Sequence, residues 1–134
     1  MPDRRRSSGR RSQKTPPKKF ELSTELMERA YELVAHTSPF DRWNMPPPDE
    51  VVFRTTRSKN TIGDYHRDGA GRHIIRGSVH LVGSLFTLIA LMSHEMIHLH
   101  QCRAGMLTSN PHDAAFHKLA DQVCAIHGFD RRAF

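Results

Sequence analysis

The stretch from His94 to His98 reads HEMIH, with two histidines four positions apart and a glutamate directly after the first. On an α-helix, residues four apart lie about 40° apart around the axis and one turn along it, so both imidazoles can reach one ion. Glu95 falls close enough to contact a water on that ion but is poorly placed to be a ligand. This spacing suits two neutral imidazoles that hold Zn²⁺ and a carboxylate that takes a proton from the water.

A chance pattern is the alternative, because ten of the 134 residues are histidine. The surrounding sequence argues against chance, since the residues from Leu85 to Met92 are apolar almost all round a helix, which indicates a helix buried in the middle of the molecule. Two histidines without a task in such a helix would be buried polar groups without partners, which is costly. We therefore predict a metal site with His94 and His98 as ligands.

A catalytic zinc site needs a third protein ligand and an open fourth position. No glutamate follows Glu95, which excludes a downstream glutamate ligand. The extended pattern HExxHxxGxxH also fails, because Gln101 and Ala104 replace its glycine and its last histidine. Cys102 lies on the same helical stripe, but it is about 12 Å along the axis from His94 and cannot share its ion.

The remaining candidates for the third ligand are His100, His112, Asp113, His117 and His127. His100 is about 200° round the helix from His98 and points away. In the last predicted helix His112 lies on the buried face one turn before Phe116, whereas His117 sits near the rim of that face. His127 is four turns away, where it matches the C-terminal helix dipole. We predict His112 as the third ligand, with His117 as the alternative.

The elements that must position these residues follow from periodicity and capping residues. Residues 23–36 carry a capping serine, early acids and apolar residues at helical spacing, which predicts a first helix. After a proline-rich loop, residues 51–56, 61–66 and 72–81 read as three short strands, the last two joined through the turn RDGAG. We expect an antiparallel sheet of these three strands.

Two further helices complete the predicted order. Residues 84–104 predict the central helix, which Gly105 ends. Asn110 is expected to cap a last helix with Pro111 at its first position, and Gly128 to end it.

The basic charge of the chain lies at its N-terminus. Residues 1–20 hold eight of the twenty Lys and Arg against one acid, which leaves twelve basic and thirteen acidic residues after them. Ser, Gly, Pro and like charges cannot bury enough apolar surface to fold, so we predict a disordered basic tail over residues 1–20 and one domain over residues 21–134. One interpretation of this tail is that it only makes the protein more soluble. The other, which we expect, is that its charges neutralise phosphates of DNA or RNA and so bind nucleic acid without sequence preference.

Other classes of protein are disfavoured. The longest apolar run, residues 81–92, is too short to span a bilayer, and no apolar segment follows the N-terminal charges as it would in a secretory signal. We expect a cytoplasmic protein with no membrane partner. Cys102 and Cys124 form no CxxC pair, and we expect both to be free thiols.

The sequence resembles the SprT-like zinc metallopeptidases, with their Spartan-type protease domain. The resemblance is carried by Tyr31 in the first helix, GDY from Gly63, HIIRGSVHL from His73, HEMIH from His94, and HDAAF from His112. It implies that His94, His98 and His112 are the zinc ligands, that Glu95 is the catalytic base, and that the substrate is a protein or peptide.

We therefore predict an α+β, zincin-like single domain in which a small antiparallel three-stranded sheet packs on a central HExxH helix with flanking helices. The predicted function is zinc-dependent peptide hydrolysis, acting on DNA-associated proteins. The alternative is a non-catalytic nucleic-acid-binding accessory protein whose structural zinc has a fourth protein ligand and gives Glu95 no task. Tyr65 and His66 are candidates for stabilising the oxyanion, because their strand should lie near the site, and ordinary sheet packing is the alternative.

Overall fold

The computed structural model describes residues 15–134, and the part of the predicted basic tail within residues 1–14 lies outside the described residues. Over the described residues the chain is an α+β structure of three α-helices and one three-stranded sheet, as predicted. In chain order the elements are α2 (Thr24–Ala35), β1 (Val51–Thr56), β2 (Gly63–Arg67), β3 (His73–Ser78), α3 (Leu85–Arg103) and α4 (Ala114–His127). No helix within residues 15–134 is long and apolar enough to cross a membrane.

The boundaries of the first two helices follow the capping residues in the sequence. The Ser23 hydroxyl accepts the backbone N–H of Leu26 at 3.1 Å, and the Ser84 hydroxyl accepts that of Thr87 at 3.1 Å. Side-chain acceptors of this kind satisfy backbone donors that the first turn of a helix leaves unpaired. After α3, Gly105 adopts a φ of 70°, a left-handed conformation that favours glycine and ends the helix where the sequence predicts.

The start of α4 differs from the prediction. The helix begins at Ala114, because the Asp113 carboxylate accepts the backbone N–H of Phe116 at 3.0 Å and so acts as the N-cap. The predicted cap, Asn110, instead accepts the backbone N–H of His112 at 3.1 Å within the preceding turn. The predicted place of His112 on the buried face of this helix is therefore wrong, and His112 is an exposed residue of the turn before α4.

The sheet is mixed, and the prediction of an antiparallel sheet is wrong for β1. The strand order is β1-β3-β2, with β1 parallel to β3 and β2 antiparallel to β3. The central place belongs to β3 because it is the most buried strand, whereas β1 buries only Val51 and β2 buries no residue. The turn between β2 and β3 is as predicted, with the Asp68 carboxylate accepting the N–H groups of Ala70 and Arg72 at 3.0 and 2.8 Å.

Two glycines allow α3 to cross the sheet closely. Gly63 of β2 lies opposite Gly77 of β3. A Cβ atom at Gly63 would lie 2.4 Å from the Arg76 carbonyl oxygen and 2.7 Å from the Leu91 Cδ1 atom, and one at Gly77 would lie 3.1 Å from the Leu22 side chain. A side chain at Gly63 would push β2 away from α3, so this glycine sets the distance between the strand and the helix that carries HEMIH.

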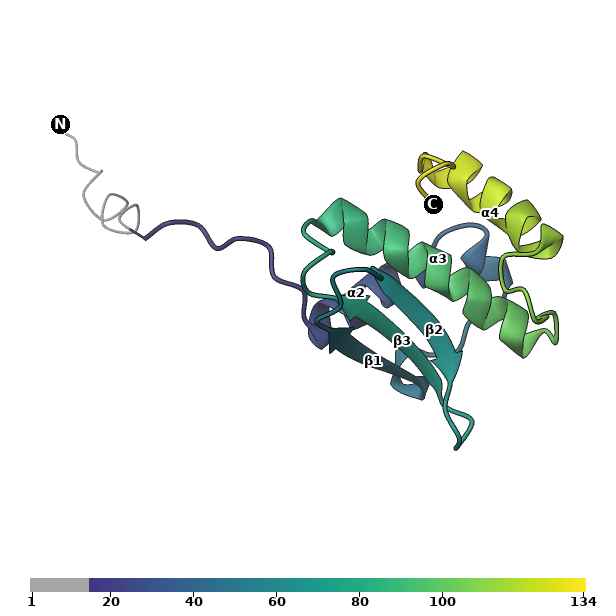
Figure 1. Ribbon diagram of the computed structural model, residues 1–134. Helices are drawn as coiled ribbons and strands as arrows, with labels where there is room; N and C mark the ends of the chain where they lie inside the picture. The colour runs from purple at the N-terminus through teal and green to yellow at the C-terminus, as the bar shows by residue number, and fades with distance from the viewer. Residues whose placement is uncertain (1–14) are drawn as a thin grey trace.

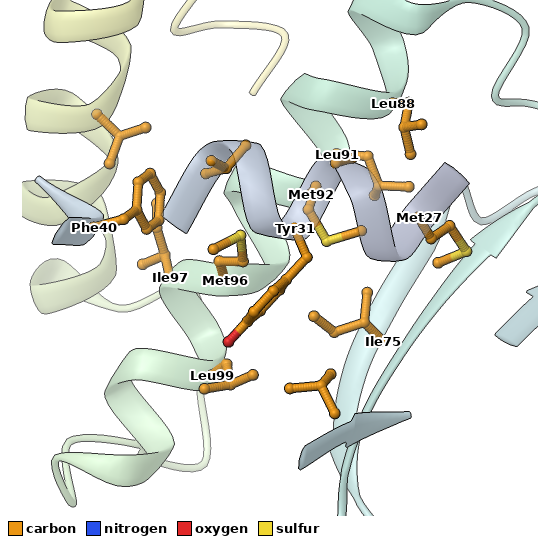
Figure 2. Packing of buried hydrophobic residues seen from close by; sticks show 14 of the residues in the cluster. Met27, Tyr31, Phe40, Ile75, Leu88, Leu91, Met92, Met96, Ile97 and Leu99 are labelled. Atoms are coloured by element: carbon orange, nitrogen blue, oxygen red, sulfur yellow. The ribbon is translucent and has the colours of Figure 1, made fainter. Parts of the chain in front are cut away.

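The helix α3 lies at the centre of the molecule, between the sheet and α4 (Figure 1). Its apolar residues pack with α2 and with Ile75 of the sheet in one core (Figure 2). The fully buried Tyr31 of α2 donates its hydroxyl proton to the Pro46 carbonyl oxygen at 2.6 Å, which holds the proline-rich loop against the core. Because α3 packs on both sides, the middle of this helix is buried, including Glu95 and His98 of the HEMIH motif.

Candidate metal centre

Three histidine side chains from two separate segments meet at the surface of α3. His94 and His98 come from that helix, and His112 comes from the turn before α4. The Nε2 atom of His112 lies 3.2 Å from the Nε2 atoms of both His94 and His98, and one ring nitrogen from each residue lies within 4.8 Å of the other two. Ligands about 2.0–2.1 Å from a tetrahedral Zn²⁺ lie about 3.3 Å apart, so the spacing of these nitrogens fits the ion.

Hydrogen bonds among the three rings do not account for this arrangement. A neutral imidazole carries one proton, so the Nε2 atom of His112 cannot donate to both neighbours. His94 directs its other nitrogen, Nδ1, to the Phe134 carbonyl oxygen at 2.8 Å and so donates its proton there. That bond fixes the tautomer in which the Nε2 lone pair of His94 points into the group, as it does in metal-binding histidines.

Burial keeps the imidazoles of α3 neutral. Loss of solvent lowers the pKa of His94 to about 4, assisted by the neighbouring His112. Loss of solvent also lowers the pKa of His98 to about 4, assisted by His94 and His112. Metal ligands must be deprotonated, so at neutral pH both side chains are in the form that binds a cation.

One aromatic side chain of α4 contacts all three histidine rings. Phe116 of α4, which is 2 % exposed, has its ring centroid 5.0 Å from that of His94, 4.6 Å from that of His98 and 4.8 Å from that of His112. Its ring is stacked on that of His98 with an interplanar angle of 15°. Phe116 thus holds the histidines in place and keeps water away from their buried side.

Glu95 lies beside the three histidines but is not one of the group. Its side chain is 4 % exposed, and burial, with a smaller contribution from the charge of Asp64, raises the pKa of its carboxyl group to about 8. Within residues 15–134 the group that could hold a metal ion contains only the three histidines. The arrangement therefore has three imidazole donors, a neighbouring carboxyl group and no fourth protein donor among the described residues.

The other candidate ligands are engaged elsewhere. His100 stacks on Trp43 with 4.2 Å between ring centroids. His117, the alternative third ligand, accepts a hydrogen bond from Arg131 at 2.7 Å through Nδ1, and His127 donates from Nε2 to the Ser38 carbonyl oxygen at 2.6 Å. None of these three histidines joins the group, and Asp113 serves as the cap of α4.

Two supporting residues escaped the sequence analysis. The first is Phe134, whose carbonyl group holds His94 across forty positions of the chain, a contact that no local pattern signals. The second is Gln101, which is 1 % exposed and lies three residues after His98 on α3. The Nδ1 atom of His98 and the Oε1 atom of Gln101 are both buried without a hydrogen-bond partner, and the Gln101 side chain counters the lowering of the His98 pKa. A hydrogen bond from the Nδ1–H group of His98 to the Oε1 atom of Gln101 would satisfy both atoms.

A cavity of about 340 Å³ opens over the histidines and Glu95, and β2 forms one of its walls. Tyr65 and His66 both line it, as the position of their strand predicts. The Tyr65 hydroxyl is 2.7 Å from the Nδ1 atom of His73, so its first hydrogen bond lies within the sheet. Burial raises the pKa of Tyr65, which keeps this hydroxyl protonated.

One known protein family matches most of this chain. A model of the SprT-like family matches residues 23–132, nearly the whole of the described chain. The chain belongs to the SprT-like family. A comparison with curated proteins gives no match. The match covers all three helices and the whole sheet of this SprT-like chain, including the histidine group and Glu95.

Proposed function

We propose that this SprT-like protein is a zinc-dependent metallopeptidase with His94, His98 and His112 as ligands and Glu95 as general base. The observation that carries the proposal is the position of Glu95, a buried carboxyl group next to three converging imidazoles that no fourth donor among residues 15–134 joins. A structural zinc site has four protein ligands, whereas a catalytic one keeps a position for water or substrate.

The chemistry divides between the ion and the protein side chains. A bound zinc ion would acidify a water molecule and polarise the carbonyl group of a peptide. Burial favours the protonated form of Glu95, and a cation held by the three histidines would favour its carboxylate form. In that form Glu95 would accept the proton from the attacking water and deliver it to the leaving amine. Phe116 and Phe134 hold the histidine rings in position.

The edge of the sheet suits an extended peptide. β2 pairs only with β3 among the described strands, so its other edge faces the cavity over the histidines. An exposed edge binds an extended peptide by main-chain hydrogen bonds, which almost every residue type can make. We therefore propose a protein or peptide substrate that lies along β2 with its scissile bond over the histidine group.

The test uses the zinc-loaded protein and a mixture of unstructured peptides, with fragments identified by mass spectrometry. We expect the wild type to cleave these peptides. Glu95→Gln should abolish cleavage and still hold about one zinc per chain. Cleavage by Glu95→Gln at a comparable rate would show that Glu95 is not the base. A wild type that binds zinc and cleaves no peptide would favour the accessory protein with a structural zinc.

The partner and place of action are part of the same proposal. The eight basic residues within positions 1–20 suit electrostatic contact with DNA or RNA, which needs no fixed structure. Such contact would hold the peptidase near proteins already bound to nucleic acid. We place this action in the cytoplasm.

A further inference from the structure

A second cavity lies on the other side of Glu95. It has a volume of about 350 Å³, and its walls include Ile62, Phe86, Ala90, Leu91 and Phe134. Its size is at the lower end of the range of about 300–1,000 Å³ that small-molecule pockets occupy. The cavity is therefore large enough for one bulky side chain rather than for a long segment.

This cavity adjoins the one over the histidines. Gly63, His94 and Glu95 line both, so the two cavities meet where β2 passes the first histidine of α3. The histidine cavity also contains Asp64 and Arg67, whereas the second cavity contains no charged side chain other than Glu95. A peptide along β2 would therefore pass the charged side chains of Asp64 and Arg67 on one side of the histidine group, and neither of them on the other.

The walls of the second cavity are apolar up to its mouth. Phe86 is 65 % exposed and Ile62 is 40 % exposed. The one hydroxyl group in the wall belongs to Thr87 and accepts a hydrogen bond from Ser84 at 3.0 Å. A charged side chain in this cavity would lose its hydration and find no partner of its own in the apolar walls, which is costly.

The aromatic wall of the second cavity contacts the histidine group. The aromatic rings of Phe86, Phe129, Phe134 and His94 follow one another with centroid distances of 5.9, 5.7 and 5.1 Å. The Phe134 carbonyl group also accepts the Nδ1–H of His94. The C-terminal segment therefore returns to α3 (Figure 1). Ala133 and Phe134 of this segment line the cavity beside His94.

We propose that this cavity binds the apolar side chain of a substrate residue next to the scissile bond, so that the preferred substrates carry a residue such as Leu, Phe or Met there. The inference rests on the proposed peptidase function. In an extended peptide successive residues are about 3.3 Å apart. With the scissile bond over the histidine group, a residue flanking that bond lies nearest to a cavity that His94 and Glu95 line.

The experiment measures kcat/KM of the zinc-loaded protein on peptides that differ only at the two residues flanking the cleaved bond. At one of the two positions we expect Leu to exceed Ala by about tenfold or more, since each methylene in an apolar pocket discriminates by roughly that factor. Asp at that position should be worse still. Ala90→Phe fills the cavity and should reduce the preference to within about twofold, and Phe86→Ala should weaken it.

The matched control is Leu33→Ala, which removes another exposed apolar side chain, 59 % exposed, on α2. It should leave the preference unchanged. Cleavage without preference at either flanking position, or a preference that Ala90→Phe leaves intact, would overturn the cavity assignment while leaving the peptidase proposal standing.

A binding measurement keeps the two proposals separate. If the wild type cleaves nothing, the peptidase proposal fails, and the dissociation constants of the same Leu and Asp peptides for zinc-loaded Glu95→Gln still test the cavity. If the Leu peptide binds more tightly than the Asp peptide and Ala90→Phe removes this difference, the proposed role of the cavity is supported. Equal binding of the two peptides overturns it. If the wild type forms a dimer and Phe86→Ala abolishes it, the apolar walls contact a second copy of the chain. That result would also overturn the proposal that the cavity binds a substrate side chain.

Discussion

Glu95→Gln should have opposite effects on activity and on the stability of the metal-free protein. Burial raises the pKa of the Glu95 carboxyl group from 4.5 to about 8. The folded state therefore keeps the proton up to about pH 8, whereas the unfolded chain loses it near pH 4.5. Between these values the folded state binds more protons than the unfolded state, so the free energy of unfolding falls as the pH rises.

The magnitude follows from the width of that interval. Each pH unit contributes about 1.36 kcal/mol, so at pH 7.5 buried Glu95 lowers the free energy of unfolding by at most about 4 kcal/mol. Glutamine has nearly the same shape and does not titrate, but it brings a buried amide with its own hydrogen-bonding requirement. We expect Glu95→Gln to stabilise the metal-free protein by at least about 2 kcal/mol at pH 7.5, an increase in Tm on the order of 10 °C.

The assay is thermal unfolding of both proteins with a chelator at pH 5 and at pH 7.5. The difference in Tm should be small at pH 5 and large at pH 7.5, and the titration of the histidines is common to both proteins and cancels. Zinc should reduce the difference, because a nearby cation favours the carboxylate form. Glu28→Gln, which changes an exposed carboxylate on α2, is the control and should leave the Tm nearly unchanged. A variant no more stable than the wild type at pH 7.5, or a difference independent of pH, would refute the reasoning.

Three further predictions concern the metal and the tail. His112→Ala should lose zinc and therefore have a lower Tm than the zinc-loaded wild type, because the ion links the turn before α4 to α3. His117→Ala should keep its zinc. Metal analysis after gel filtration shows which of the two histidines is the ligand. Gln101→Leu should weaken zinc binding about tenfold or more in a chelator competition. Gln101→Glu keeps an acceptor for His98 and should weaken it less. Equal zinc affinities of Gln101→Leu and the wild type would contradict the role of Gln101. Deleting residues 2–19 should remove most of a salt-dependent affinity for DNA and leave folding and zinc binding intact, and equal binding by both chains across a salt series would show that the tail does not recruit nucleic acid.

Local features of this protein could be predicted because they depend on neighbouring residues. The caps at Ser23 and Ser84 and the end of α4 at Gly128 follow from hydrogen bonds and backbone conformations within one turn. The nearness of His94 and His98 follows from helical geometry alone, and the apolar residues before them place their helix in the core.

The tertiary structure decided what depends on contacts between distant segments. The direction of β1 could not be read from its residues, because parallel and antiparallel pairing bury the same side chains, and the order β1-β3-β2 follows from the burial of β3. The sequence predicted His112 as a ligand by placing it on the last helix, but that helix begins two residues after His112. A turn held by hydrogen bonds of Asn110 and Asp113 brings its ring to the group instead. The bond from His94 to Phe134 and the apolar cavity beside it exist only because the chain returns from α4 to α3. Side-chain types and local spacing determine which chemistry is available, and long-range packing determines which residues meet.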